Sequence, residues 1–229
     1  MPVMENQITL NGDEILVLRN CRDDGSSHNG FVWPESGFVE CPDWVDNEVC
    51  GNGLHGLPWG VGSVSYFYEE PAKWLVFVAS TAKGRYVHGV GDFTDKCKSA
   101  SARVVYCGEK QGAIDLIAAH LPAGLAMNFA TQTAGDESTQ TAGYASTQKA
   151  GNKSTQTAGD ASTQTAGDES TQKAGKNSVQ VSIWWSDGQW HSACRMVPIE
   201  DVDKWCRVEN GIWRDCTVEE SATAELKIK

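Results

Sequence analysis

The stretch that decides the fold is STQTAGDASTQTAGDESTQKAG, residues 154–175, in which the same eight letters return with few changes. A degenerate leading copy, AMNFATQT, starts at residue 126, so the tract covers residues 126–181. Glycine at a fixed position in a short repeat is typical of stacked coils, so we predict a β-solenoid. Aligned as A-G-x-x-S-T-Q-x, the regular copies begin at Ala134, Ala142, Ala150, Ala158, Ala166 and Ala174.

Alternation within each copy predicts which side chains face the inside of a coil. Successive side chains on a strand point to opposite faces, so Ser154, Gln156 and Ala158 share one face and Thr155 and Thr157 share the other. Small inward residues let two strands approach, and stacked Ser and Gln can hydrogen-bond from coil to coil. We expect octapeptide half-coils, about 16 residues per coil, with the repeat glycines taking the turn conformations that side chains disfavour.

The segments on either side of the tract differ from it in composition. Residues 1–125 contain four apolar strand patterns and one amphipathic helix pattern, which together predict an α+β domain. The helix, at residues 110–121, is expected to bury Ile114, Ile117 and Ala118 on one face. The strand patterns are at 14–21, 73–80, 84–90 and 102–108.

The tail, residues 182–229, begins within the first of four short strand patterns that are separated by tight-turn signals. It therefore predicts a β-rich C-terminal cap, with tryptophans supplying the bulk that the repeats lack. A solenoid needs such caps because its end coils expose unpaired strand edges, and we expect residues 1–125 to cap the other end. The tryptophans are Trp184, Trp185, Trp190, Trp205 and Trp213.

Charge is distributed unevenly along the 229 residues, whose net charge is -11. The repeat tract is nearly neutral, with five acidic and four basic residues, and no Lys or Arg occurs between residues 23 and 72. This window is turn-rich and irregular in pattern, and its acidity disfavours nucleic acid as a direct ligand and favours a basic partner surface or solubility. Its acids are Asp23, Asp24, Glu35, Glu40, Asp43, Asp46, Glu48, Glu69 and Glu70.

The sequence shows no export signal, no membrane-spanning run and no familiar metal-site spacing. The first residues carry acids and no cationic start, and no apolar run reaches the roughly 18 residues that span a bilayer. We therefore expect a cytoplasmic protein with no membrane contact, in which the eight cysteines stay as free thiols. Cys41, Cys50 and His55 match no familiar zinc spacing, so we predict no metal and no cofactor.

The best candidate for chemistry is CGNGLHG, residues 50–56, where Cys50 and His55 lie in a glycine-rich loop. A thiol nucleophile with a histidine base also needs an orienting acid and an oxyanion hole, and neither is specified by the sequence. The GLHG letters resemble the nicotinamide-site strand of ADP-ribosyltransferases, which implies a later glutamate at Glu69, Glu70 or Glu109. No phosphate-binding loop, nucleophile elbow or dinucleotide fingerprint is present, so we predict no enzyme and keep this as the alternative.

The octets themselves resemble the repeat of bacterial ice nucleation proteins, and AGYASTQKAG from residue 142 is the nearest copy. The resemblance implies outward Thr-x-Thr pairs that order water and a tyrosine ladder that joins two molecules. Lys149 and Lys173 interrupt the two faces, and only Tyr144 stands at a ladder position, so we expect the tract to be mainly a regular spacer. The predicted outward threonines are Thr131, Thr133, Thr139, Thr141, Thr155, Thr157, Thr163 and Thr165.

The order of motifs along the whole chain resembles that of a broad family of uncharacterised proteins found in phages and prophages. These motifs are HNGFVWPESG, CGNGLHGLPWG, KWLVFV, VVYCG, the repeats and a tryptophan-rich tail. The resemblance implies a phage-encoded accessory protein. We therefore predict a non-catalytic interaction protein that binds and inhibits or redirects a host defence or nucleic-acid-handling protein.

The predicted contact surface lies between residues 33 and 59, where acidic charge steers a basic partner and aromatic rings anchor it. A structural or oligomerisation module, with a homodimer through the solenoid edge or weak ice binding through the threonine rows, is the second alternative. The predicted contact residues are Trp33, Glu40, Asp43, Trp44, Asp46, Glu48, His55 and Trp59.

Overall fold

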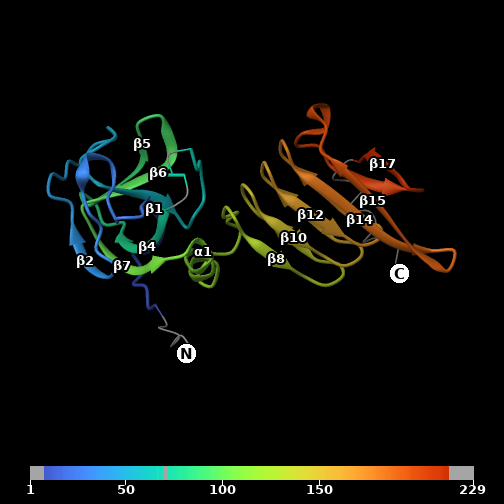
Figure 1. Ribbon diagram of the computed structural model, residues 1–229, viewed down its shortest axis with the longest axis horizontal. Helices are drawn as coiled ribbons and strands as arrows, with labels where there is room; N and C mark the ends of the chain where they lie inside the picture. The colour runs from blue at the N-terminus through green and yellow to red at the C-terminus, as the bar shows by residue number, and fades with distance from the viewer. Residues whose placement is uncertain (1–7, 66, 70–71, 217–229) are drawn as a thin grey trace. The chain divides into compact units, whose positions relative to one another are not determined.

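The computed structural model describes residues 8–65, 67–69 and 72–216, and it divides into two compact units, Met1–Ala123 and Gly124–Lys229. Figure 1 shows the first unit in blue and green and the second in yellow to red. Glu70, one of the expected acids, and the end of the tail beyond residue 216 lie outside the described residues.

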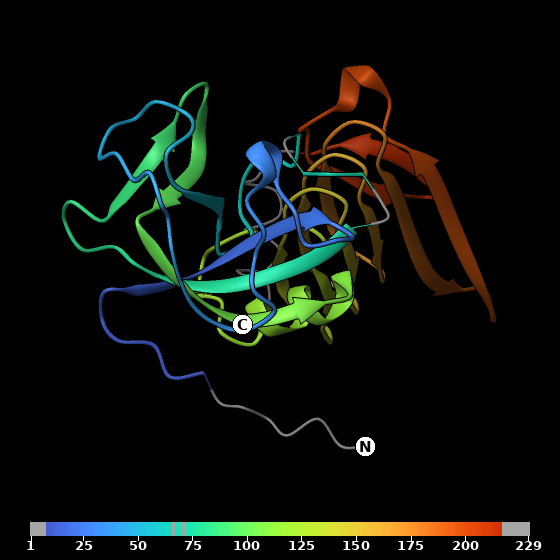
Figure 2. The same cartoon turned by 60° about the vertical axis from the view of Figure 1, so that its left-hand side comes forward.

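The first unit is built on one antiparallel sheet of seven strands in the order β2-β7-β4-β1-β3-β6-β5. Its longest strands, β1 and β4, pair along their full length and lie side by side in Figure 2. The elements are β1 (Glu14–Arg22), the 3-10 turn η1 (His28–Gly30), β2 (Gly37–Glu40), β3 (Leu54–Pro58), β4 (Ala72–Ser80), β5 (Tyr86–Val90), β6 (Phe93–Ser99), β7 (Ser101–Gly108) and the helix α1 (Lys110–Ala118).

The core of the first unit is apolar and is formed by the central strands. Leu16 and Leu18 of β1 and Leu75 and Phe77 of β4 have no exposed surface. Helix α1 contacts β4 and β7 and buries Ala113, Ile114 and Ile117. The expected strands at 14–21, 73–80, 84–90 and 102–108 are confirmed, but Ala118 is exposed and its place on the buried face belongs to Ala113.

Three strands of this sheet escape the sequence pattern. The segment expected to be irregular contains β2 and β3, and β6 lies at Phe93–Ser99, where the sequence pattern indicates no strand. In β6 the inward position is held by Lys98, whose Nζ donates to Asn47 Oδ1 and to the Val49 carbonyl oxygen, both at 2.9 Å. A buried lysine that ties down a loop looks like surface in the sequence, which explains the missed strand.

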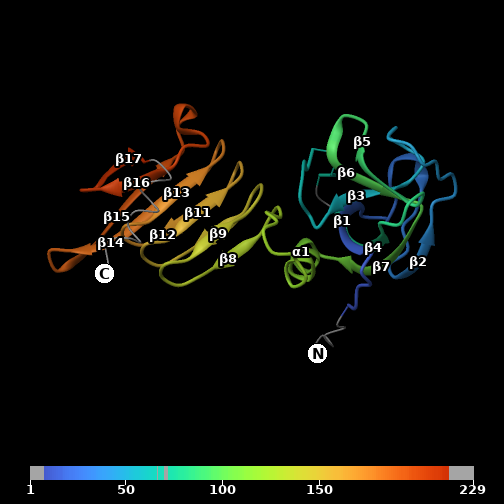
Figure 3. The same ribbon diagram turned by 180° about the vertical axis from the view of Figure 1, so that it is seen from behind.

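The second unit contains the predicted solenoid, in which each coil of 16 residues contributes one short strand to each of two parallel sheets (Figure 3). One sheet has the order β15-β14-β12-β10-β8 and the other β17-β16-β13-β11-β9. The strands are β8 (Thr131–Thr133), β9 (Thr139–Thr141), β10 (Thr147–Lys149), β11 (Thr155–Ala158), β12 (Thr163–Ala166), β13 (Thr171–Ala174), β14 (Val179–Ser186), β15 (Gln189–Met196), β16 (Cys206–Glu209) and β17 (Ile212–Asp215).

The inside of the solenoid is polar, as the alternation predicts. Ser154 and Gln156 are 1% and 0% exposed. Gln156 Nε2 donates to Gln140 Oε1 in the coil below at 2.9 Å and across the core to the Thr165 carbonyl oxygen at 3.1 Å. The same pair of hydrogen bonds recurs at Gln148, Gln164 and Gln172, so the glutamines form continuous ladders along both sheets.

The repeat glycines are needed for a different reason from the predicted one. The left-handed backbone conformation lies two residues later, for example at Lys153 and Ala161, with φ of 54° and 55°. A Cβ at Gly151 would lie only 2.7 Å from the backbone nitrogen of Asp136 in the coil below, so glycine there permits close stacking of the coils.

The predicted C-terminal cap is confirmed as two hairpins. β14 continues the first sheet in parallel and turns into β15, while β16 pairs with β13 at Gln172 and turns into β17. Trp184, Trp205 and Trp213 are half-buried, but Trp185 and Trp190, also expected to fill the cap, are 56% and 71% exposed.

Arg195 of β15 closes one glutamine ladder. Its Nη2 and Nε donate to Gln180 Oε1 at 2.8 and 3.0 Å, and its Nη1 donates to Asp201 Oδ2 at 2.9 Å. Its guanidinium also lies 4.6 Å from the ring centroid of Trp213. The last glutamine oxygen of this ladder is therefore satisfied by a side chain of the cap.

In the described part of the chain, no helix has the length and apolar character needed to cross a bilayer.

Candidate functional site

The threonines predicted to point outward form two groups, one on each face of the solenoid. On the sheet of β8, β10 and β12, register places Thr131 beside Thr147 and Thr147 beside Thr163. The companion row runs Thr133, Lys149, Thr165, so a lysine interrupts this face at its centre. Thr147 also belongs to this row, although Lys149 leaves it outside the Thr-x-Thr pattern of the sequence.

The opposite face has an uninterrupted group of four threonines. Register places Thr139 and Thr141 of β9 directly beside Thr155 and Thr157 of β11. The next rung, Thr171 and Lys173, lies against the cap: Thr171 is 3% exposed and Lys173 Nζ lies 5.8 Å from the ring centroid of Trp205. The expectation that lysine breaks both faces is therefore wrong for this face, because Lys173 stands at its end.

The geometry of this face is set by the backbone. Parallel strands lie about 4.8 Å apart, and alternate residues along a strand are about 6.6 Å apart. The four hydroxyls and four methyl groups of the β9–β11 face, defined by Thr139, Thr141, Thr155 and Thr157, therefore form a regular grid. Because the inward glutamines hold the strands from below, the grid is fixed in place and can bind water at repeated positions.

The acidic residues expected at a contact surface are exposed, as Glu40, Asp43, Asp46 and Glu48 all lie on or beside the loop after β2. Asp43 also has a structural role, since its carboxylate accepts hydrogen bonds from Asn52 Nδ2 at 2.7 Å and from Cys41 Sγ at 3.1 Å.

The tryptophans expected at that surface are less accessible. Trp33 is 4% exposed and stacks on Phe77 with ring centroids 5.2 Å apart, so it is a core residue and cannot anchor a partner. Trp44 and Trp59 are half-buried, and Trp44 Nε1 donates to the Gly84 carbonyl oxygen at 3.1 Å. Sequence pattern alone does not distinguish a surface tryptophan from one that holds a loop on a core.

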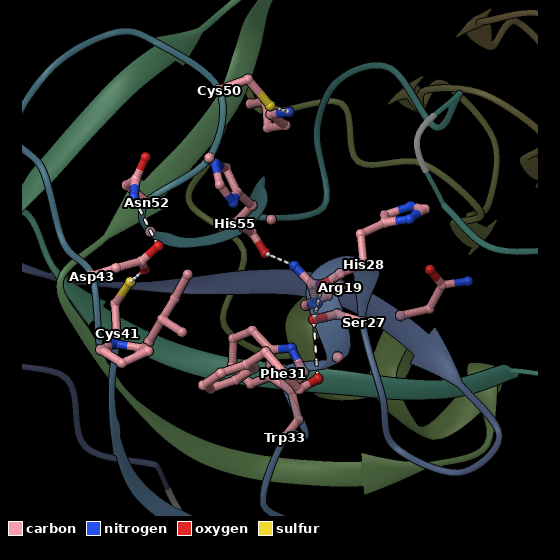
Figure 4. A pocket seen from close by; sticks show the side chains of 18 of the residues that line it. Arg19, Ser27, His28, Phe31, Trp33, Cys41, Asp43, Cys50, Asn52 and His55 are labelled. Atoms are coloured by element: carbon pink, nitrogen blue, oxygen red, sulfur yellow. Dashed lines mark hydrogen bonds between the residues drawn. The ribbon is translucent and has the colours of Figure 1, made fainter.

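A cavity of about 540 Å³ opens in the first unit beside His55. Figure 4 shows Cys41, Asp43 and Asn52 on one side of it, Arg19 and His28 on the other, and Phe31 and Trp33 below. Arg19 Nη1 donates to the His55 carbonyl oxygen at 2.8 Å, and its guanidinium lies 4.8 Å from the Trp33 ring centroid. Strand β3, which the sequence pattern missed, therefore supplies one wall of the cavity.

Cys50 and His55 both line this cavity, but each has a different chemical environment from that of a catalytic pair. Lys96 Nζ lies 3.1 Å from Cys50 Sγ. Burial, together with the positive charges of Lys96, Arg19 and Lys98, lowers the pKa of His55 to about 3. A histidine with so low a pKa is a weak general base at neutral pH, since its conjugate acid is scarcely formed.

The glutamates considered for an ADP-ribosyltransferase site do not complete it. Glu69 and Glu109 are exposed and are not among the residues that line the cavity, and Glu70 lies outside the described residues.

A separate cluster in the cap brings three groups of metal-ligand type, those of Asp201, Cys206 and Asp215, within 4.8 Å of one another. Its carboxylates already pair with Arg195 and Lys204, and burial raises the pKa of Cys206.

No family model and no solved structure matches the chain. Similar curated proteins include an ice nucleation protein of Xanthomonas campestris pv. translucens, which is 32% identical over 124 residues, or 53% of this chain and 8% of that protein. The ice nucleation protein InaU of Pantoea ananas is 34% identical over 109 residues, which cover 47% of this chain and 10% of that protein. InaA of the same organism is 47% identical over 53 residues.

The matched part of the chain thus spans only 4–10% of the length of these curated relatives. The longer matches exceed the 56 residues of the tract, so the similarity extends beyond the octets. The second unit is therefore a short β-solenoid, with 16-residue coils and a β-rich cap, whose repeats are similar to those of ice nucleation proteins.

Proposed function

We propose that the chain is a non-enzymatic structural module that orders water on the β9–β11 face and binds ice weakly through it. The observation that carries the proposal is the register of four threonines on two neighbouring strands, with the only lysine of that face at its capped end. Hydroxyl groups bind water, while the methyl groups limit the ways in which that water can arrange itself.

The small size of the face favours ice binding over nucleation. The face has two full rungs, about 5 Å apart along the solenoid. A surface that starts freezing must hold an ice embryo large enough to grow, whereas adsorption to existing ice needs only a local match. The named activity of the relatives belongs to much longer proteins, of which the matches cover only 8% and 10%.

The test is inhibition of ice recrystallisation by the full chain and by Thr157→Lys. This position corresponds in register to Lys173, so the fold already accepts lysine there. The matched control is Glu137→Lys, which adds a cation at a turn position that already holds lysine in the copy at Lys153. We expect the unaltered chain and the control to slow crystal growth equally, and Thr157→Lys to lose most of the effect.

Two results would contradict this proposal. One is that the unaltered chain leaves crystal growth unchanged at every concentration at which it stays soluble. The other is that Thr157→Lys and Glu137→Lys act alike, since the threonine face would then be irrelevant.

As a second candidate, we propose that the loop after β2 binds a host protein with a basic surface. The observation that favours it is an exposed run in which Asp46 and Glu48 lie between Val45 and Val49, which are 43% and 66% exposed. Acidic groups around exposed apolar ones fit the usual composition of a protein contact surface, in which charge steers and apolar groups are buried.

Capture from bacterial lysate tests this second candidate. We expect one dominant partner to be held by the unaltered chain and by a control with Asp23→Asn and Asp92→Asn, two exposed acids outside the loop. The same partner should be lost with Asp46→Asn and Glu48→Gln. Equal capture by both double variants would exclude the loop as the contact surface.

A homodimer through the solenoid edge is the further partner that we propose for the second unit. In the described part of the chain, β8 and β9 are the end strands of their sheets, and end strands expose backbone groups that can pair with another strand. Light scattering at rising protein concentration should give a mass above that of one chain. A single-chain mass at the highest concentration would exclude the dimer.

A further inference from the structure

The cavity of the first unit collects buried polar atoms that the protein leaves unpaired. Trp33 Nε1, His55 Nε2 and Tyr68 OH have no hydrogen-bond partner among the described residues, and all three residues line the cavity. An unpaired buried polar group costs about 1–3 kcal/mol. Three such atoms in its walls leave this part of the protein short of polar partners, although each atom is itself shielded from solvent.

The charges around this space favour an anion. The cations that line it are Arg19 and Lys96, and the acid that lines it is Asp43, whose carboxylate accepts hydrogen bonds from Asn52 and Cys41. Lys96 is 5% exposed, so its charge is poorly screened by solvent. The depressed pKa of His55 reports the same positive surroundings, in addition to its burial.

The walls of the cavity favour a planar ring. Phe31, Phe67 and Tyr68 are half-buried aromatic residues that line it, and Phe31 lies edge-on to Trp33 with ring centroids 5.5 Å apart. Aromatic walls with a few convergent polar groups are typical of small-molecule sites, and a volume of 540 Å³ falls in their usual range. A mononucleotide has the size, the ring and the negative charge that such a space accepts.

We propose that this cavity binds a small planar-ring anion of mononucleotide size, with its ring against Phe31 and its charged group at Arg19 and Lys96. Arg19 lies on one side of the cavity and Phe31 below it, so both parts of such a ligand have a place there (Figure 4). The site belongs to the first unit and is independent of the threonine face of the second. It requires no reaction.

The test is isothermal titration calorimetry of the full chain with AMP, GMP and UMP, together with adenosine and inorganic phosphate as incomplete ligands. We expect at least one mononucleotide to bind with one-to-one stoichiometry. Adenosine lacks the charge and phosphate lacks the ring, so each should bind at least tenfold more weakly than that mononucleotide. Absence of saturable binding by all three mononucleotides, or equal binding of adenosine and AMP, would overturn the proposal.

Two variants place the bound molecule in the cavity. Arg19→Gln should weaken mononucleotide binding at least tenfold, whereas Arg85→Gln, which removes an exposed arginine of the same unit, should leave it unchanged. Because Arg19 packs on Trp33, the near-ultraviolet circular dichroism of the Arg19→Gln variant is compared with that of the unaltered chain first. If that variant has lost its fold, Phe31→Leu is tested in its place. A folded cavity variant that binds as tightly as the unaltered chain would place the ligand elsewhere and exclude this site.

Discussion

The two units reach a packed interior by opposite routes. The first buries aliphatic and aromatic side chains such as Leu16, Leu75 and Phe77, as most globular domains do. The second buries glutamine and serine, and Gln148, Gln156 and Gln164 have no exposed surface at all. Polar side chains can therefore form a core when a regular repeat places an acceptor one coil away, as it does for Gln148, Gln156 and Gln164.

This contrast has an energetic consequence. Apolar burial contributes in proportion to area, so the first unit tolerates substitutions that conserve volume. A satisfied hydrogen bond contributes only about 1 kcal/mol, but an unsatisfied buried group costs about 1–3 kcal/mol. The solenoid is therefore most sensitive where a ladder is closed and where coils approach most closely.

The largest effect is expected at the closed end of the ladder. Arg195→Met leaves Gln180 Oε1 and Asp201 Oδ2 without their guanidinium donor, and it should lower the free energy of opening of residues 124–216 by about 3 kcal/mol. Segment-resolved hydrogen exchange measures this separately for each unit. Arg214→Met, an exposed arginine in the next hairpin, is the control and should change little. Equal effects of the two variants would show that Arg195 does not close the ladder.

The next effect tests the close approach of the coils. Gly151→Ala places a Cβ against the backbone of Asp136 and should cost about 2 kcal/mol by the same exchange measurement. Gly135→Ala has open space around the added carbon and is the matched control, expected to be neutral. If Gly151→Ala proved as neutral as Gly135→Ala, the coils would not be stacked as closely as the structure shows.

In the first unit, the pH dependence of the unfolding free energy tests the burial of His55. The pKa of His55 is lowered from 6.5 to about 3 by burial and by Lys96, Arg19 and Lys98, so the unfolded chain binds more protons between these values. Unfolding free energy should therefore fall as pH falls from about 6.5 toward 3. Between pH 7 and 4 the unaltered chain should lose roughly 3 kcal/mol more than His55→Gln, as measured by exchange in β1 and β4. The same pH dependence in both chains would exclude this role of His55.

The smallest effect concerns the left-handed turn positions of the solenoid. Ala161 has φ of 55°, which costs an L-residue with a Cβ about 1 kcal/mol relative to glycine. Ala161→Gly should therefore stabilise the second unit by about 0.5–1 kcal/mol, in contrast to Ala158→Gly on a buried strand, which should destabilise it. A loss of stability on Ala161→Gly would contradict the assigned turn geometry.

The second unit was predictable from sequence because its information is local and repeated. The alternation within one octet predicts that Gln156 points inward, and the 16-residue period of two octets predicts its hydrogen-bond partner, Gln140. The position of the left-handed residue was not predictable in this way, since the glycine is the more obvious candidate for a turn and its true constraint is a neighbouring coil. Nor could the sequence show that Lys173 packs against the cap.

The first unit was less predictable because its structure depends on contacts distant in sequence. Strands β1, β4 and β7 follow from their apolar runs, but β3 and β6 depend on each other and on the buried Lys98. The cavity beside His55 is formed by residues from 19 to 96, so no local motif announces it. Trp33 was misplaced on the surface because the composition of its segment is polar.

The most direct test of the account is amide exchange in the octapeptide tract, because its composition alone would suit a disordered linker. Nuclear magnetic resonance can follow both the backbone amides of β10 to β13 and the side-chain Nε2 groups of Gln148, Gln156 and Gln164. We expect slow exchange at all of them, with the side-chain groups protected by the ladders and the cross-core hydrogen bonds. Exchange at the rates of an unfolded chain would contradict an ordered polar core.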